Sequence, residues 1–434
     1  MSDLHQAISF AAGLYRERAG VLLSGYVRRD QVALLALAPG RADPYAIYDR
    51  IRARGTIVPT RVGDWATPSH RVCSAVLRDR RFGVRLGDEL AADDLDMSLL
   101  TMNPPDHTRL RRLIQPAFSP KIVAGYAGRI ERTVTDLLDA AAAAGEFDLI
   151  SDFAAVLPIA VITDLLGIPD ADAAYFARIG AIIGSAIGGV RSLRHARALQ
   201  ESADALERLF AGLFELRRRE PADDIVSRIV AAEGTQIMPS EMQSMCALLL
   251  VAGFETTVNA IGNGVLALLG HPDQWRALCA DPAGLAPRAA SEALRFDPPV
   301  QLTGRVALEP QELEGKLVRR GQSVTTLIAA ANRDPEVYDD PARFDIHREL
   351  PVEHLAFSSG IHYCIGQPLA RLEATIALQM LAERMPGLTR NGPVKRRNTT
   401  VIHGPLEFPV KLTASTAPAL APSGRPSARE AAQR

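Results

Sequence analysis

Phe357-Ser358-Ser359-Gly360-Ile361-His362-Tyr363-Cys364-Ile365-Gly366 is the segment from which the architecture of this chain can be inferred. Gln367-Pro368-Leu369-Ala370-Arg371 follows directly and predicts the start of a helix, because proline is favoured just inside a helix N-terminus. The expected apolar face of this helix includes Leu369, Leu372, Ile376 and Met380. Cys364 therefore stands in a glycine-punctuated loop immediately before a helix.

The chemistry of Cys364 follows from this position. Backbone N–H groups and the helix dipole at a helix N-terminus favour a thiolate. The nearby glycines let the backbone curl around the sulfur and let a flat ligand approach closely. Because no cysteine or histidine partner stands at a metal-ligand spacing, the thiolate indicates ligation of a metal that a macrocycle already holds, namely haem. The alternative is a buried structural cysteine.

Composition narrows the remaining possibilities. The chain has 434 residues, 49 Lys+Arg against 50 Asp+Glu, 47% hydrophobic residues and 23% charged residues, as in an ordinary globular protein with a sizeable core. A net charge of −1 argues against broad nucleic-acid binding. Four cysteines in a chain of this length do not indicate a disulfide framework. The N-terminus lacks the pattern of a signal peptide, and we expect no membrane anchor and a soluble cytoplasmic protein.

Helical periodicity dominates the chain. Apolar residues recur at three- and four-residue steps from Pro120 to Ala144, and Gly145 follows as a stop signal. Strands are predicted for 56–62, for a hairpin over 316–329 that turns near Arg320-Gly321, and for 401–412. We therefore expect a mainly α fold with a minor β region, formed as one large domain over residues 1–413. Residues 414–434 are rich in Ala, Pro and Ser and predict a disordered tail.

One long helix conflicts with local propensity at its centre. Ser240 is the predicted N-cap, with Gln243 reaching back to it, and Gly270-His271-Pro272 ends the helix. Within this apolar helix lies Ala252-Gly253-Phe254-Glu255-Thr256-Thr257, which places a carboxylate and two hydroxyls where a core is expected. Such conflicts mark functional sites. The alternative is that Glu255 faces solvent and Gly253 only allows close helix packing.

These segments together resemble the cytochrome P-450 family. Residues 357–366 resemble its haem-binding loop, F-x-x-G-x-H/R-x-C-x-G, and residues 252–257 resemble its oxygen-binding helix motif. Glu292-Ala293-Leu294-Arg295 resembles its E-x-x-R motif, and Pro341-Ala342-Arg343-Phe344 its later arginine-containing loop. The resemblance runs from Tyr45 to Leu412 and is strongest to soluble bacterial members. It implies the cytochrome P-450 fold, a single large domain with a long central helix over the haem.

The resemblance implies the haem-binding residues. Cys364 would be the proximal iron ligand of haem b, in a loop bounded by Phe357 and Gly366. Two haem propionates need cations or hydrogen-bond donors. The residues that match the family's propionate-binding positions are His107, Arg111, Arg305 and His362.

The resemblance also implies catalytic and structural roles. Thr256 would hydrogen-bond dioxygen, Glu255 would relay protons through water, and Gly253 would open a notch in the helix for dioxygen. Glu292, Arg295 and Arg343 would form a buried structural triad, so we expect them to govern folding and haem retention.

The expected function is that of a monooxygenase acting on an apolar small molecule. The segments 85–101 and 179–190 would cover the pocket, the second as a mobile lid, and residues 300–303 would line it. Oxidative coupling, desaturation or C–C cleavage on the same fold is an alternative, as is a haem sensor without turnover. Electrons would come from a ferredoxin and its NAD(P)H-dependent reductase, docked near Arg112 and Arg371. The basic runs 217–219 and 395–397 are interpreted as solvated faces.

Overall fold

The computed structural model describes residues 2–60, 63–87, 97–187 and 189–413, so the tail predicted for 414–434 lies outside the described residues. Helices predominate, as expected. They are α1 (Ser2–Leu22), α2 (Gln31–Leu35), α3 (Ala38–Ala42), α4 (Tyr45–Arg52), α5 (His70–Arg78), α6 (Asp106–Ile114), α7 (Pro120–Gly125), α8 (Ala127–Ala144), α9 (Val156–Leu166), α10 (Ala173–Ala186), α11 (Leu193–Arg219), α12 (Ile225–Ala231), α13 (Pro239–Gly270), α14 (Pro272–Ala280), α15 (Pro282–Phe296), α16 (Ile328–Ala331) and α17 (Gln367–Arg384).

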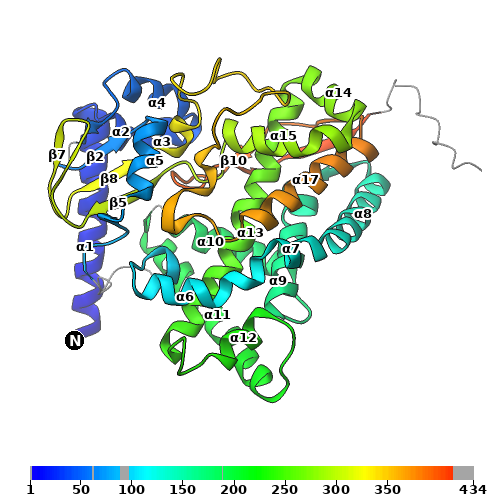
Figure 1. Cartoon of the computed structure of the whole chain (residues 1–434), viewed down its shortest axis with the longest axis horizontal. Helices are drawn as coiled ribbons and strands as arrows, with labels where there is room; N and C mark the ends of the chain where they lie inside the picture. Colours follow the sequence, from blue (N-terminus) through cyan, green and yellow to red (C-terminus); the bar gives the residue numbers. More distant parts are fainter. Residues whose placement is uncertain (1, 61–62, 88–96, 188, 414–434) are drawn as a thin grey trace, which may run out of the picture.

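The strands are short and gather mainly at one side of the molecule, next to α1–α5 (Figure 1). They are β1 (Val58–Pro59), β2 (Trp65–Thr67), β3 (Phe82–Gly83), β4 (Glu146–Asp148), β5 (Thr303–Ala307), β6 (Gln311–Leu313), β7 (Lys316–Val318), β8 (Ser323–Thr326), β9 (Leu388–Arg390), β10 (Lys395–Arg396), β11 (Pro405–Glu407) and β12 (Pro409–Leu412). The main sheet has the order β1-β2-β8-β5-β3, and β8 pairs parallel with β2 and antiparallel with β5.

The predicted hairpin over 316–329 is wrong. The hairpin is formed by β6 and β7 and turns at Glu314-Gly315, where both residues adopt positive φ. Gly321 turns the chain out of β7, and β8 then joins the main sheet instead of pairing with β7. The residue pattern at 323–326 predicted a strand, but it did not predict that this strand pairs with β2 and β5. The late β segment predicted for 401–412 is confirmed by β11 and β12.

Helix α13 is the core of the molecule (Figure 1). It has 32 residues, and among the described residues it is the one helix long and apolar enough to cross a membrane, but 78% of its most apolar window is buried inside the protein. It is therefore a core helix. The predicted N-cap is wrong by two residues: Pro239 starts the helix, and the Glu241 carboxylate accepts the N–H of the N-cap residue Met238 at 2.8 Å.

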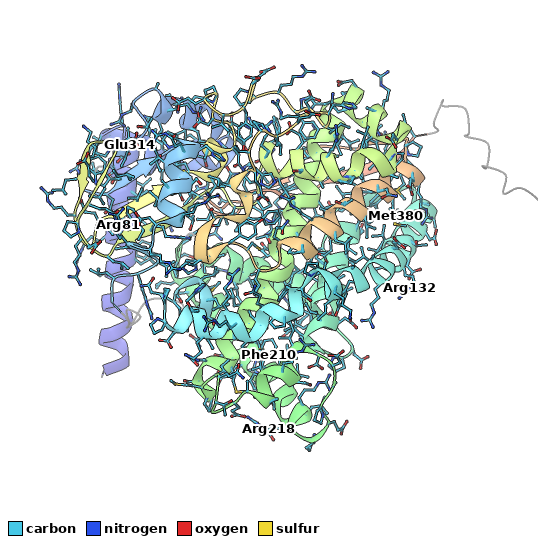
Figure 2. The ribbon with its side chains drawn as sticks, viewed as in Figure 1. Arg81, Arg132, Phe210, Arg218, Glu314 and Met380 are labelled. Atoms are coloured by element: carbon cyan, nitrogen blue, oxygen red, sulfur yellow. The ribbon has the colours of Figure 1, made fainter. Side chains whose placement is uncertain are left out.

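Other helices pack around α13 by placing small residues at the contacts. α15 and α17 lie against it and against each other, where Gly264 faces Ala293 and Leu378 (Figure 1). The predicted helix over 120–144 forms with a break at Tyr126, as α7 and α8. Figure 2 shows the resulting division, with Phe210 inside the helical part and Arg132 and Arg218 at its periphery.

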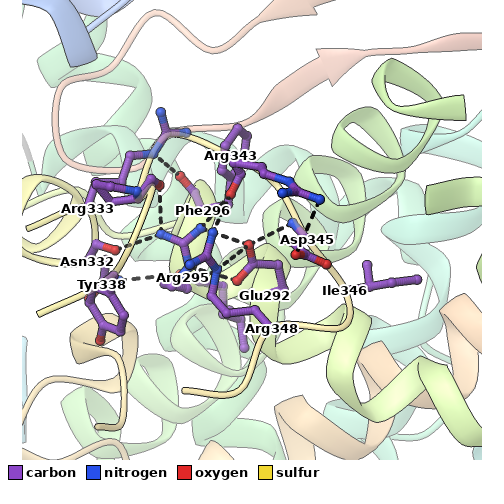
Figure 3. A network of polar contacts seen from close by, with 12 residues as sticks. Glu292, Arg295, Phe296, Asn332, Arg333, Tyr338, Arg343, Asp345, Ile346 and Arg348 are labelled. Carbon is purple, nitrogen blue, oxygen red and sulfur yellow. Dashed lines mark hydrogen bonds and ion pairs between the residues drawn. The ribbon is translucent and has the colours of Figure 1, made fainter. Parts of the chain in front are cut away.

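A buried ion pair within α15 forms the centre of a network that reaches the segment after α16, and the predicted triad needs one correction. Glu292 and Arg295 are 2% and 0% exposed and form two 2.7 Å hydrogen bonds (Figure 3). The Arg343 side chain is 61% exposed, and only its carbonyl accepts a hydrogen bond from Arg295. The second guanidinium beside Glu292 is that of Arg348, 3.4 Å away. Arg348 therefore takes the place that the motif resemblance assigned to Arg343.

Candidate active site

A cavity of about 690 Å³ lies between α13 and the Cys364 loop. Its walls come from segments far apart in the sequence, from Val84 to Ile402. Most of the wall opposite Cys364 is apolar, with side chains such as Leu248, Leu249, Val300, Leu302 and Ile402. The prediction that residues 300–303 line the pocket is confirmed for Val300, Leu302 and Thr303.

The loop that carries Cys364 is held by backbone contacts. The Cys364 N–H donates to the Phe357 carbonyl at 2.9 Å, and Gly366 is the N-cap of α17. Gly360 has φ +69°, and a Cβ at this position would lie 2.3 Å from the Leu77 carbonyl oxygen, so only glycine fits. The sulfur-bearing residue lines the cavity directly. The loop thus presents one thiol to the cavity with its backbone fixed on both sides.

The acidity of the Cys364 thiol depends on opposing effects. Burial raises its pKa above the ordinary value, whereas the backbone N–H groups of Gly366 and Gln367 and the charge of Arg111 lower it. The helix N-terminus therefore acts as the sequence predicts, but burial outweighs it in the protein alone. A bound metal cation supplies the remaining stabilisation of a thiolate.

The four predicted propionate ligands come together at one edge of the cavity. His107 lies on α6, Arg305 on β5 and His362 in the turn before Cys364, and the two imidazole rings are 4.2 Å apart. Arg111 donates to the Tyr363 carbonyl at 2.6 Å. The pKa of His107 is lowered to about 4 and that of His362 to about 3, by burial first and then by neighbouring cations.

This cluster fits an anionic ligand. Burial alone lowers the pKa of Arg305, to about 10, and no acidic residue of the described chain pairs with Arg111 or Arg305. The Nδ1 atom of His107 and the Nε2 atom of His362 are buried and have no hydrogen-bond partner among the residues that the structure describes. A buried positive cluster without counter-charges is unfavourable unless a ligand neutralises it. Together with the thiol that faces the cavity, the cluster fits the propionates and the iron of haem b.

On the opposite wall, α13 presents its polar segment to the cavity. Ala252, Gly253, Glu255 and Thr256 all line it. The Thr256 hydroxyl donates to the Ala252 carbonyl at 3.2 Å, which leaves its oxygen lone pairs free to accept a hydrogen bond. A Cβ at Gly253 would lie 2.6 Å from Ile162 of α9, so close helix packing requires this glycine whatever its role toward dioxygen. The predicted notch at Gly253 stays a prediction.

Glu255 does not face solvent. Its side chain is 4% exposed, and its Oε1 atom accepts a 2.5 Å hydrogen bond from the Nη1 atom of Arg397. Burial raises the pKa of Glu255 to about 7, and Arg397 opposes this rise. The interpretation of the run 395–397 as a solvated face is therefore wrong for Arg397, which is 10% exposed. In the run 217–219 it is also wrong for Arg217, which is 15% exposed and pairs with the buried Asp224.

Sequence reasoning missed two further charged residues that line the cavity. The Arg85 guanidinium makes no hydrogen bond or ion pair with any described residue, and its Nε atom is buried, whereas the Arg85 carbonyl accepts a hydrogen bond from Asn103 at 2.9 Å. Glu373 of α17 is 1% exposed, and burial raises its pKa well above the ordinary value. Glu373 lies on the apolar face of α17, among residues that follow a helical apolar pattern. A carboxylate at an apolar position of that pattern is the one sequence signal that could have identified Glu373 as a site residue.

The segment predicted as a mobile lid is mostly helical. Residues 179–186 belong to α10, and its glycines make close contacts with α13. A Cβ at Gly180 would lie 2.1 Å from the Phe254 ring, and one at Gly184 would lie 3.0 Å from Glu255. Gly180 and Gly184 therefore serve packing, and the mobility predicted for the segment 179–190 stays a prediction. Of the other predicted cover, 85–101, part lies outside the described residues.

Comparisons with known proteins agree with this geometry. The family described as cytochrome P450 matches residues 285–386. A putative cytochrome P450 140 of Mycobacterium tuberculosis is 36% identical over 91% of this chain and 94% of its own length. The cytochrome P450 monooxygenase PikC of Streptomyces venezuelae is 40% identical over 80% of this chain and 85% of its own. The structure of P450BioI in complex with hexadec-9Z-enoic acid ligated acyl carrier protein has a TM-score of 0.80 and 35% identity, covering 86% of this chain and 98% of that one.

Proposed function

Because this chain belongs to the cytochrome P450 family and is a haem-thiolate monooxygenase with haem b as its cofactor, we propose that it oxidises an apolar small molecule with electrons from a ferredoxin. The observation that carries the substrate proposal is the cavity itself: Cys364 lies on one side, the polar segment 252–256 on the other, and apolar side chains form most of the wall between them. A substrate held there is desolvated on all sides.

The bound haem supplies dioxygen activation, assisted by electron donation from the cysteine thiolate. The protein residues control protons and water. The Thr256 hydroxyl, which donates its proton to the Ala252 carbonyl, is placed to accept a hydrogen bond in the cavity, and Glu255, with a pKa of about 7, can exist in either protonation state near neutral pH. The apolar wall limits bulk water, which would divert reducing equivalents to side reactions. We propose that Glu255 passes protons towards Thr256.

The substrate proposal can be narrowed by Arg85. A guanidinium that lines an apolar cavity, without an acidic partner among the described residues, favours an apolar molecule that carries a carboxylate or another anionic group. P450BioI, a structural neighbour, was solved with a fatty acyl chain carried on a protein. The proposal concerns a free carboxylate group, which would accept hydrogen bonds donated by the Arg85 guanidinium.

Spectral titration of the haem tests this proposal. Palmitic acid and its methyl ester are titrated into the wild type and into Arg85→Gln, with the exposed Arg80→Gln as the matched control. The wild type and the control are expected to prefer the acid, and Arg85→Gln is expected to lose roughly tenfold in affinity for the acid alone, the equivalent of one charge-assisted hydrogen bond. Equal affinity for acid and ester in the wild type contradicts the anionic substrate, and binding of neither contradicts the apolar one.

Membership of the cytochrome P450 family implies a redox partner, and we propose an acidic ferredoxin. Arg112 is exposed on α6, the helix that also carries the haem-side residues His107 and Arg111. Arg371 is 35% exposed and already pairs with Glu353, so it contributes less free charge. Arg112→Glu is expected to slow reduction of the iron by a ferredoxin and to weaken its salt dependence. Arg132→Glu, exposed on α8 (Figure 2), is the control. Equal reduction rates for both variants would exclude the Arg112 surface.

The type of oxidation is tested by labelled dioxygen. Incorporation of one labelled oxygen atom into the product supports hydroxylation or epoxidation. A product without label indicates coupling or desaturation, which the same site can also perform. The cytoplasm, where reduced ferredoxins and reduced thiols are available, is the proposed compartment.

A further inference from the structure

Arg397 is the feature of the site that the mechanism above does not use. It lies just after β10, 142 positions along the chain from Glu255, and it inserts its guanidinium next to α13. Its Nη1 atom donates to Glu255 Oε1 at 2.5 Å, and its Nε atom donates to Asn259 Oδ1 at 2.9 Å. Both partners lie on α13, four residues apart, so they share one face of the helix.

The contact is held from several sides. Asn259 donates its Nδ2 group to the Glu255 carbonyl at 2.6 Å, which fixes the amide that orients Arg397. The Arg397 N–H donates to the Gly404 carbonyl at 3.0 Å, and a Cβ at Gly404 would lie 2.1 Å from Asn259 Oδ1. The glycine therefore allows the two strands of this late segment to approach α13. These contacts hold the Arg397 guanidinium in one defined position.

Arg397 is also the charged group that acts on Glu255 among the described residues. On α10, Gly184 lies next to the Glu255 side chain, and α13 contributes the neutral Asn259. Because these neighbours are neutral, removal of the Arg397 cation would leave Glu255 as a buried carboxylate without an opposite charge. Such a carboxylate takes up a proton.

The segment that carries Arg397 is tied to the connection between α10 and α11. Arg191 of that connection donates its Nη1 group to the Asn398 carbonyl at 2.5 Å. Its N–H donates to His195 Nδ1 at 3.1 Å, and His195 Nε2 lies 2.7 Å from the Ser185 hydroxyl. Arg191 thus links the end of α10, which packs on Glu255 through Gly184, to the residue that follows Arg397.

We propose that Arg397 is a positioning residue for Glu255: it fixes the carboxyl group on the cavity wall and favours its ionised form, and this hold depends on the Arg191–Asn398 contact, which supports the segment that carries Arg397. The inference rests on the proton-transfer role proposed above for Glu255. With the Arg191–Asn398 contact in place, Arg397 stays paired with Glu255 and opposes its protonation. Loss of that contact removes a support of the Arg397 segment and shifts Glu255 towards the protonated form, which can later donate the proton.

The test is a titration of the Glu255 carboxyl group by infrared difference spectroscopy of the purified holoenzyme. The carboxylic acid band of Glu255 is assigned by its absence in Glu255→Gln. In the wild type its midpoint is expected near the pKa of about 7. In Arg397→Gln the midpoint is expected to rise by roughly one to three pH units, and Arg397→Lys, which keeps the charge, should return it most of the way to the wild-type value. Arg191→Gln is expected to move the midpoint in the same direction by a smaller amount.

Lys395→Gln is the matched control, because Lys395 stands two residues away, is 61% exposed and pairs only with Glu407. The reduced carbon-monoxide spectrum verifies in each variant that the haem site is intact. An unchanged midpoint in Arg397→Gln overturns the positioning role, and a shift in Arg397→Gln but none in Arg191→Gln overturns the link to the α10–α11 connection. If Arg397→Gln does not fold, Arg397→Lys tests the positioning role of Arg397, and Arg191→Gln tests the link to Arg191. The titration needs neither substrate nor ferredoxin. Its result is therefore independent of whether the proposed substrate class and the proposed ferredoxin partner are correct.

Discussion

The ion-pair network around Glu292 allows a direct choice between two arginines. The motif resemblance assigns Arg343 to the network, whereas the structure places the guanidinium of Arg348 there (Figure 3). We therefore expect Arg348→Met to destabilise the protein and Arg343→Met to have almost no effect. Methionine keeps most of the aliphatic length of arginine, so the comparison removes the charge and the hydrogen bonds with little change in packing.

The size of the effect follows from the contacts. The Arg348 side chain is 11% exposed and donates to the carbonyls of Asp339, Asp340 and Arg343 at 2.5, 3.0 and 3.0 Å, in addition to its 3.4 Å contact with Glu292. Breaking a buried pair costs about 3–5 kcal/mol, but Glu292 keeps both hydrogen bonds from Arg295, so we expect about 2–4 kcal/mol. Arg343 is 61% exposed and lies 3.7 Å from Asp345, which corresponds to about 0–1 kcal/mol.

Thermal unfolding of the two holoenzyme variants measures the difference. With about 2.1 cal/mol/K of unfolding entropy per residue, a chain of 434 residues loses roughly 1 °C in Tm for each kcal/mol. Arg348→Met is expected to lower Tm by roughly 2–4 °C, and Arg343→Met by at most about 1 °C. Circular dichroism follows the helices and the haem absorbance follows cofactor loss. If Arg343→Met lowers Tm as much as Arg348→Met, the assignment of the network to Arg348 is refuted.

Three further outcomes are expected. Thr256→Ala should retain the carbon-monoxide spectrum but divert electrons from NAD(P)H to peroxide, whereas Thr257→Val, which changes a buried hydroxyl 3.5 Å from the Gly253 carbonyl, should not; equal peroxide yields would contradict the role of Thr256. Arg305→Gln should lose haem to apomyoglobin roughly tenfold faster, and an unchanged rate would remove Arg305 from the propionate site. Burial lowers the pKa of His354 to about 3, whereas the unfolded chain takes up this proton below about pH 6.5. The free energy of unfolding should therefore fall by about 2 kcal/mol between pH 6.5 and pH 5. Tm measurements over this pH range should show that His354→Asn lacks this part of the acid sensitivity.

Local sequence patterns predicted the parts of this protein that are local in structure. The Cys364 loop, the proline at the start of α17 and the apolar helix with a polar centre depend on neighbours within a few residues, so spacing was sufficient. The four propionate-site residues come from three separate segments, and here the family resemblance supplied what periodicity does not carry.

The missed features are those in which an ordinary residue acquires its role from a distant one. Arg397 stands in a basic run that looks like a surface segment, and only the approach of that run to α13 buries it. Arg348 lies outside any motif, yet its chain segment passes over Glu292. The pairing of β8 with β2 and β5 likewise depends on strands more than 200 and about 20 residues away. Charge type and hydropathy are the same for a solvated arginine and for a buried one.

The residues that line the cavity are far apart in the sequence. Their spacing determines when, during synthesis of the chain, the protein can bind its cofactor. The ribosome adds Cys364 long after Val84, and the wall is complete only when Ile402 has followed. At about 5–20 residues per second, the 319 residues from Val84 to Ile402 take roughly 16–64 s to synthesise. Porphyrin capture is therefore a late step of biogenesis, and a nascent polypeptide released early has no enclosed place in which to keep it.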